Sequence, residues 1–259
     1  MPTERKHREE IVRYGRMLHE RGFVAAMDGN LSVRLKNERI LVTPTCLSKG
    51  AMCLADLVIV DLDGKHVAGH RNVTSEIGMH LFIYRMRPDV RAICHAHPHT
   101  ATGFAVAGRA LDQALLPEVI VGLGQIPLVK YGTPGTPELS AAIEPYVPHY
   151  DALLLANHGA VTCGPDLITA FFRMETLEHF AKITLAAEMA GTPTLLSSRE
   201  VAKLIAARTR YFVVPPPGGG ADLPLTCDGG ETAGDRVRLT RNELDALIDE
   251  AVRKDRSRR

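Results

Sequence analysis

The amino-terminal third of the chain shows one helical pattern followed by several strand-like patterns. Apolar residues recur at helical spacing over residues 5–20, and Gly22 follows them as a stop signal. Short apolar stretches then predict strands over residues 30–35, 39–43, 57–61 and 65–67. The next stretch predicts a helix over residues 75–87, which ends before Pro88 because proline disfavours a helical residue in front of it.

The middle of the chain mixes strands and helices without strict alternation. An apolar stretch over residues 90–94 predicts a buried strand that continues into His95, and a short helix follows Pro98. Further strands are predicted near residues 118–121, 127–129, 152–156 and 159–163. Further helices are predicted over residues 136–146, 165–190 and 198–208. This mixture favours the α/β class, with a largely antiparallel or mixed sheet that helices cover.

The pattern changes after Val214. Three prolines and three glycines occupy residues 215–220, and the stretch to Gly234 has the composition of a linker or a loosely packed arm. Residues 240–243 then form a capping box, which predicts an amphipathic helix with Leu244, Leu247 and Val252 on one face. We therefore expect a main domain over residues 1–214, followed by a Pro/Gly-rich arm and a carboxy-terminal amphipathic helix over residues 215–259.

Composition narrows the range of partners and compartments. A formal net charge of +1 over 259 residues gives no electrostatic case for binding nucleic acid or an acidic membrane surface. No apolar stretch approaches the ~20 residues that span a bilayer, and the charged first residues do not resemble a signal peptide. Five widely spaced cysteines do not make a disulfide framework. We expect a cytoplasmic protein that binds neither nucleic acid nor a membrane.

Three histidines have the placement of metal ligands. His95 and His97 alternate at the end of the predicted strand, so both side chains point to one face. His158 follows the apolar stretch 152–156, at the end of another predicted strand. Three imidazoles with an open fourth position are typical of catalytic zinc. Iron, cobalt and nickel accept the same ligands and stay open as alternatives, although the many helices disfavour the all-β scaffold of iron oxygenases.

Glu76 has two interpretations. It follows Thr74 and Ser75 at the start of a predicted helix, where an acidic residue often only complements the helix dipole. The same helix start offers free N–H groups and two hydroxyls to an anion. If the metal lies nearby, the place combines a carboxylate, an anion site and a Lewis acid, which suits proton transfer next to a carbonyl group.

The ordered set of motifs resembles the class II aldolase/adducin family, in particular its fuculose-phosphate aldolases. The resemblance covers about residues 5–212. The matching segments are residues 29–34 (GNLSVR), 43–45 (TPT), 74–76 (TSE) with Met79-His80, 87–90 (RPDV), 95–98 (HAHP), 126–127 (IP), 131–136 (YGTPGT) and 157–159 (NHG).

The resemblance implies a fold, a metal and a reaction. The fold would be a three-layer α/β/α arrangement around a central, mainly antiparallel sheet, in a homotetramer with active sites between subunits. Zn²⁺ would be held by His95, His97 and His158, with Glu76 as general acid and base. The enzyme would be a lyase that cleaves a ketose 1-phosphate to dihydroxyacetone phosphate and an aldehyde through a zinc-stabilised enediolate. The implied phosphate-binding residues are Asn30, Thr45, Thr74 and Ser75, and Tyr211 matches a second, catalytic tyrosine.

Two departures from the aldolase pattern keep a second reaction open. Cys46 stands where the aldolases commonly carry glycine, and residues 115–120 lack the tyrosine that these enzymes use there. A decarboxylase or dehydratase of a keto acid, hydroxy acid or sugar acid could keep the histidines and change the pocket. A related 4-epimerase would carry aspartate in place of Glu76, and a non-catalytic scaffold would lack the histidines.

Overall fold

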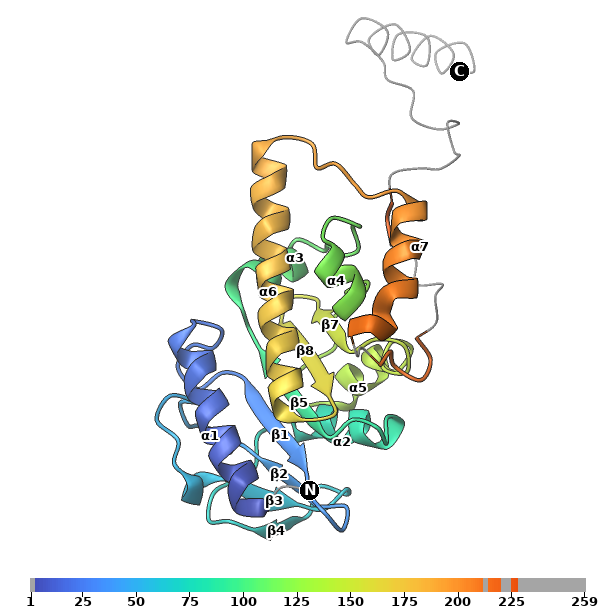
Figure 1. Ribbon diagram of the computed structural model, residues 1–259. Helices are drawn as coiled ribbons and strands as arrows, with labels where there is room; N and C mark the ends of the chain where they lie inside the picture. The colour runs from blue at the N-terminus through green and yellow to red at the C-terminus, as the bar shows by residue number, and fades with distance from the viewer. Residues whose placement is uncertain (1–2, 212–213, 220–224, 228–259) are drawn as a thin grey trace, which may run out of the picture. The chain divides into compact units, whose positions relative to one another are not determined.

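Eight short strands form one sheet in the described part of the chain (Figure 1). Their order is β4-β3-β2-β1-β5-β8-β7-β6, and all neighbours are antiparallel except β6 and β7. The central strands are buried along their whole length because helices cover both faces. The strands are β1 (Asn30–Arg34), β2 (Ile40–Val42), β3 (Val58–Val60), β4 (His66–Ala68), β5 (Ala92–Ala96), β6 (Leu128–Val129), β7 (Ala152–Leu155) and β8 (Gly159–Gly164).

This computed structural model describes residues 3–211, 214–219 and 225–227, all within a unit that spans Met1–Asp228. The predicted capping box and amphipathic helix after Thr240 lie outside the described residues. The helices are α1 (Glu4–Glu20), α2 (Ile77–Met86), α3 (His99–Val106), α4 (Pro117–Gly122), α5 (Pro137–Ile143), α6 (Leu167–Ala190) and α7 (Ser198–Ala207), with short 3-10 helices η1 (Leu54–Asp56) and η2 (Arg208–Tyr211).

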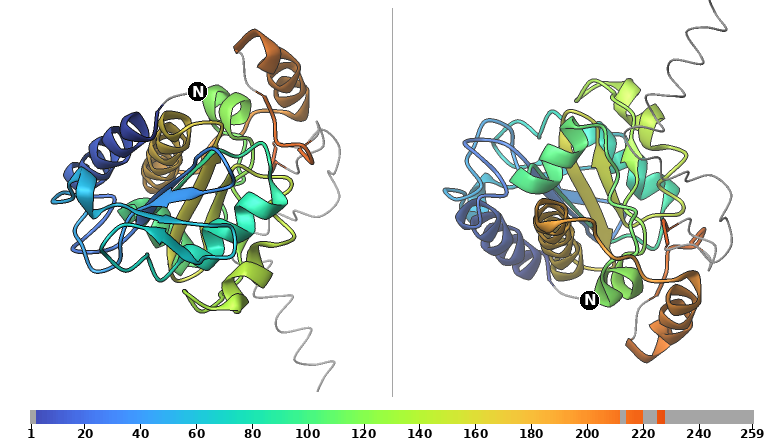
Figure 2. Two further views of the ribbon diagram at one scale, coloured as in Figure 1. Left: turned by 90° about the horizontal axis from the view of Figure 1, so that it is seen from below. Right: turned by 90° about the horizontal axis from the view of Figure 1, so that it is seen from above.

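Helices cover the sheet on both faces and make three layers (Figure 2). Helices α1, α3 and α6 bury their apolar side chains in a core that also holds Leu31, Val33 and Cys94. Helices α2 and α5 form a second core on the opposite face, around Ile93 and Val161. Neighbouring residues of β5 therefore face opposite cores, as the alternation of a strand requires. The expected three-layer α/β/α fold with a mainly antiparallel sheet is confirmed.

The strand predicted near residues 118–121 is wrong, because this segment is helix α4. Pro117 occupies the first turn of α4, where its missing N–H costs nothing. A short apolar stretch has no periodicity that separates a strand from a buried helix. Helix α7 packs against α4 around Ile120 and Val201.

Part of the predicted arm packs against the main body. Gly218 N–H donates to Pro148 O at 3.0 Å, and Gly218 O accepts from the His149 imidazole at 2.7 Å. Thr226 exchanges backbone hydrogen bonds with the segment around Gln113. Among the described residues, no helix combines the length and apolarity needed to cross a bilayer.

Candidate metal centre

His95 and His97 lie at the end of β5, one of the central strands. His95 pairs across the sheet with Asn30 on β1 and with Val161 on β8. His97 lies just beyond the strand, where its backbone N–H donates to Phe23 O at 2.9 Å. The two rings are 5.0 Å apart between centroids, so both point to the same place as the sequence predicts.

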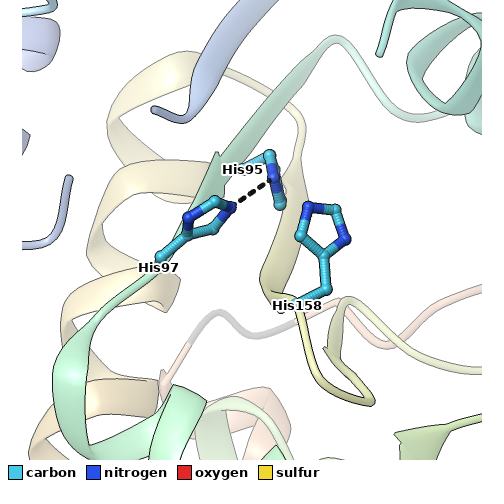
Figure 3. A group of neighbouring side chains, drawn as sticks. All are labelled: His95, His97 and His158. Atoms are coloured by element: carbon cyan, nitrogen blue, oxygen red, sulfur yellow. Dashed lines mark hydrogen bonds between the residues drawn. The ribbon is translucent and has the colours of Figure 1, made fainter. Parts of the chain in front are cut away.

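His158 reaches the same place from the loop that joins β7 and β8. The two strands pair up to Leu155 and Gly159, which leaves only three residues in the connection. Asn157 adopts a left-handed conformation with φ 55°, which asparagine tolerates better than most residues. The His158 ring lies 4.7 Å from that of His95 and 5.1 Å from that of His97 (Figure 3).

The helix after His97 is held by a buried carboxylate. Glu178 of α6 accepts hydrogen bonds from the backbone N–H groups of Thr100 and Ala101, at 3.2 and 2.9 Å. These groups belong to the first turn of α3, where a backbone N–H has no partner within the helix. Glu178 is only 1% exposed, and Lys182 balances its charge at 3.3 Å. Helix α6 therefore fixes the segment that begins directly after His97.

The hydrogen bonds around the rings leave lone pairs free for a cation. Nδ1 of His95 donates to Ala160 O at 2.9 Å, so its Nε2 carries no proton in the neutral ring. The Nε2 atoms of His95 and His97 are 3.1 Å apart. Two nitrogens bound to one tetrahedral zinc at ~2.0–2.1 Å would lie about 3.3–3.4 Å apart. Since the ligand atoms of all three histidines lie within 4.8 Å of one another, the donor set fits a divalent transition metal.

Glu76 lies directly beside the histidines. Its Oε2 is 3.1 Å from His95 Nε2, and its Oε1 is 3.2 Å from His158 Nε2. Asn30 Nδ2 donates to Oε2 at 2.8 Å, whereas the buried Oε1 has no hydrogen-bond partner among the described residues. Glu76 occupies the N-cap position of α2 without capping it. The carboxylate therefore faces the centre rather than the helix dipole.

Electrostatics favour an ionised Glu76. Burial favours the protonated acid, but the imidazoles of His95 and His158, 3.1 and 3.2 Å away, lower the pKa of Glu76 below its usual range. Burial alone would lower the pKa of His95. The neighbouring Glu76 carboxylate has the larger effect, so the pKa of His95 is raised. Burial also lowers the pKa of His97 to about 4. A bound cation would take the place of the proton that Glu76 favours on His95.

The residues implied for phosphate binding lie on three neighbouring segments. Asn30 begins β1 beside His95, and the Thr74 hydroxyl accepts from Glu76 N–H at 3.3 Å. An isolated bridge between Pro44 and Val73 places Thr45 next to the start of α2. Ser75 is exposed there. Their binding of phosphate stays a prediction.

Cys46 adopts the backbone conformation that a glycine would favour. Its φ is 55°, in the left-handed region, and its thiol is exposed. The loop of residues 43–50 therefore keeps a glycine-like path in spite of the side chain. Lys49 holds this loop, because its buried amino group donates to Met27 O at 2.8 Å and to Leu47 O at 2.6 Å.

Tyr211 and His80 lie in opposite surroundings, one exposed and one buried. Tyr211 is 63% exposed at the end of η2, and no described contact joins it to the histidines, so its catalytic role stays a prediction. His80, to which the sequence alone assigns no role, is fully buried, and its Nε2 lies 2.5 Å from Asn30 Oδ1. Its spacing of four residues from Glu76 on one helix face was the available signal.

Gly159 is required for the approach of His97, which gives a testable prediction. A Cβ at Gly159 would lie 2.5 Å from His97 Cδ2 and 2.6 Å from Ala96 O. We expect Gly159→Ala to displace His97, to lower zinc affinity in chelator competition and to destabilise the fold by about 1–3 kcal/mol. Gly103→Ala is the control, because nothing lies within 4 Å of the added Cβ. Unchanged zinc affinity in Gly159→Ala would contradict the prediction.

Comparison with known proteins finds a matching family model and two kinds of related enzyme. The family model described as "Class II Aldolase and Adducin N-terminal domain" matches residues 9–185. The 3-oxo-tetronate 4-phosphate decarboxylase of Haemophilus influenzae is 33% identical over 186 residues, which cover 70% of this chain and 88% of that protein. The L-fuculose phosphate aldolase of Methanococcus vannielii is 35% identical over 175 residues, which cover 68% of this chain and 93% of that protein.

The similarity extends to solved structures. An L-fuculose 1-phosphate aldolase superposes with a TM-score of 0.74 at 31% sequence identity, covering 81% of this chain and 98% of that one. The matched residues 9–185 include β1, α2, β5 and β8 together with all three histidines and Glu76. The chain belongs to the class II aldolase/adducin family.

Proposed function

We propose that this protein is a zinc-dependent lyase that cleaves a ketose 1-phosphate to dihydroxyacetone phosphate and an aldehyde. The observation that carries the proposal is the Glu76 carboxylate, which lies within 3.2 Å of two of three converging histidines and has one oxygen without a hydrogen bond to the residues that the structure describes. When bound by His95, His97 and His158, the metal supplies a Lewis acid for the charge that develops on the substrate carbonyl.

Glu76 moves the proton in this reaction. Cleavage removes the proton of the C4 hydroxyl while the C3–C4 bond breaks, and the bond electrons pass to the carbonyl oxygen. Oε1 of Glu76 takes this proton and delivers it to C3, which yields dihydroxyacetone phosphate and the free aldehyde. Oε2 stays bound to Asn30 Nδ2, so the carboxylate keeps its orientation during the transfer.

The phosphate group would bind at the start of α2. Ser75 is exposed there, and the loop with Thr45 lies against the same segment through the Pro44–Val73 bridge. Asn30 Nδ2 has a second N–H besides the one that Glu76 accepts. Helix N-termini favour anions because their first N–H groups have no partner in the helix.

A decarboxylase is the alternative, and its chemistry is closely related. Loss of CO₂ from a 3-oxo-tetronate 4-phosphate leaves the same enediolate of dihydroxyacetone phosphate that aldol cleavage leaves. Protonation at carbon then gives the same product, with water as the source of the proton. Relatives with both names match this chain at similar identity. The absence of a tyrosine in residues 115–120 favours this alternative, because decarboxylation releases no aldehyde whose oxygen such a tyrosine would serve.

A substrate panel separates the two reactions. We expect the zinc-loaded protein to release dihydroxyacetone phosphate from L-fuculose 1-phosphate or another ketose 1-phosphate, without CO₂. Release of CO₂ and dihydroxyacetone phosphate from 3-oxo-tetronate 4-phosphate alone would establish the decarboxylase instead. If neither substrate class gives dihydroxyacetone phosphate, the proposed function is wrong.

We also propose a cytoplasmic homotetramer, as the family resemblance implies. Because Tyr211 is exposed in the described chain, its catalytic role would require the ring to serve the site of an adjacent subunit. A Tyr211→Phe protein that turns over at the wild-type rate would remove Tyr211 from the mechanism.

A further inference from the structure

A chain of buried polar groups leads from the interior of the protein to Glu76. Tyr84 Oη lies 2.8 Å from Ser32 Oγ, which lies 2.6 Å from His80 Nδ1. His80 Nε2 lies 2.5 Å from Asn30 Oδ1, and Asn30 Nδ2 donates to Glu76 Oε2 at 2.8 Å. All of these side chains are buried, and Ser32 and His80 have no exposed surface at all. We call this set the polar relay.

The relay arises from the two regular spacings of the fold. Asn30 and Ser32 are alternate residues of β1, so they point to the same face of the sheet. Glu76 and His80 are one turn apart at the start of α2, so they lie on the same side of that helix. Helix α2 covers this face of the sheet, which brings the two pairs together.

The orientation of the Asn30 amide fixes the direction of every hydrogen bond. Asn30 Nδ2 donates to Glu76 Oε2, and the Asn30 carbonyl oxygen, which can only accept, faces His80 Nε2. His80 Nε2 must therefore carry a proton. Burial lowers the pKa of His80 to about 3, so the ring is neutral and Nδ1 accepts. Ser32 then donates to His80, and Tyr84 donates to Ser32.

The reverse direction is incompatible with the site. It would place Asn30 Oδ1 2.8 Å from a carboxylate oxygen, so that two acceptors face each other. His80 has no role in the proton transfer itself, because Asn30 separates it from Glu76. Its N–H nevertheless determines which end of the Asn30 amide faces the carboxylate.

We propose that His80 is a positioning residue that orients the Asn30 amide, anchors Glu76 through Oε2 and thereby leaves Oε1 as the atom that exchanges protons with substrate. The catalytic consequence rests on the proposed function, whereas the direction of the relay does not. Aligned N–H and O–H groups hold the carboxylate without reorganisation during the reaction, which is the usual advantage of a fixed polar environment.

The direction of the relay can be measured without any substrate. In zinc-loaded protein with ¹⁵N-labelled histidine, we expect the His80 ring to be the neutral tautomer with its proton on Nε2. The His80 signals are identified by their loss in His80→Gln. A neutral ring with its proton on Nδ1, or a charged ring at neutral pH, would overturn the proposal.

The catalytic consequence is measured with dihydroxyacetone phosphate as the probe, through deuterium exchange at its hydroxymethyl carbon in D₂O. His80→Leu should slow exchange about 10- to 100-fold at saturating probe, the usual effect of removing such a partner, with zinc content and KM near wild type. His80→Gln should recover most of the rate, because its amide can donate to Asn30 and accept from Ser32. Equal exchange in His80→Leu and wild type would refute the positioning role.

A matched control separates positioning from stability. Thr184 is 2% exposed on α6 and donates to Phe180 O at 2.9 Å, away from the relay. Thr184→Val should lower stability and leave exchange unchanged. If it slows exchange as much as His80→Leu does, the effect reflects loss of stability and the proposal fails. If wild-type protein catalyses no exchange, the proposed function fails, and the tautomer measurement still tests the relay.

Discussion

His95→Ala is expected to remove the metal and to lower turnover by about 10³-fold or more, because Lewis-acid stabilisation supplies several kcal/mol and each 1.36 kcal/mol corresponds to a factor of ten. His95 is the fully buried member of the triad and lies next to both His97 and Glu76. Metal analysis should find about one zinc per chain in the wild type and little in the variant.

His99→Ala is the control for this experiment. His99 lies two residues after His97, but its side chain is exposed on α3 and outside the triad. The His99→Ala protein should retain full zinc content and activity. Added zinc should raise the melting temperature of the wild type and of His99→Ala but not of His95→Ala, because only a bound ligand stabilises the folded state. A wild-type protein without transition metal after growth in zinc would contradict the proposed site.

Glu76→Gln is expected to keep zinc and lose about 10²- to 10⁴-fold in turnover, the usual contribution of a general base. Asn30 N–H still finds an acceptor in the glutamine carbonyl oxygen, so the new side chain keeps its anchor. The amide NH₂ then occupies the place of Oε1, where it cannot accept a proton. Deuterium exchange into dihydroxyacetone phosphate should fall by the same factor.

Glu138→Gln is the matched control for Glu76. Glu138 lies in the first turn of α5 behind the N-cap Thr136, in the helix-dipole position that is the simpler interpretation of Glu76. Its side chain is exposed and accepts from Thr133 N–H. Glu138→Gln should retain full turnover. Full turnover in Glu76→Gln would remove Glu76 from the mechanism.

The histidine triad could be predicted because its signal is local. Two histidines at alternate positions of one strand must share a face, whatever the rest of the fold. To predict that His158 joins them, one must also assume that the strand before His158 lies near the strand that carries His95. Strand β8 pairs with β5, and the hairpin before it carries His158 to the same edge.

His80 could not be identified with the same reasoning, because its spacing of four residues from Glu76 shows only that the two share a helix face, and not what His80 contacts. Its function depends on Asn30 and Ser32, which are about fifty residues away in the sequence. Only the packing of α2 on β1 brings these groups together. Helix α4 was mispredicted for a different reason: its six residues are too few to show a helical period.

The three histidines lie at the ends of neighbouring strands of a sheet that two apolar cores stabilise. His95 takes its orientation from a backbone carbonyl of β8, and the segment after His97 takes its orientation from Glu178. Contacts within the protein thus orient the donor nitrogens, in contrast to small zinc domains that fold only around their metal. We therefore expect a metal bound by this triad to exchange without refolding of the protein, so that the supply of cations in the cell contributes to which ion it carries.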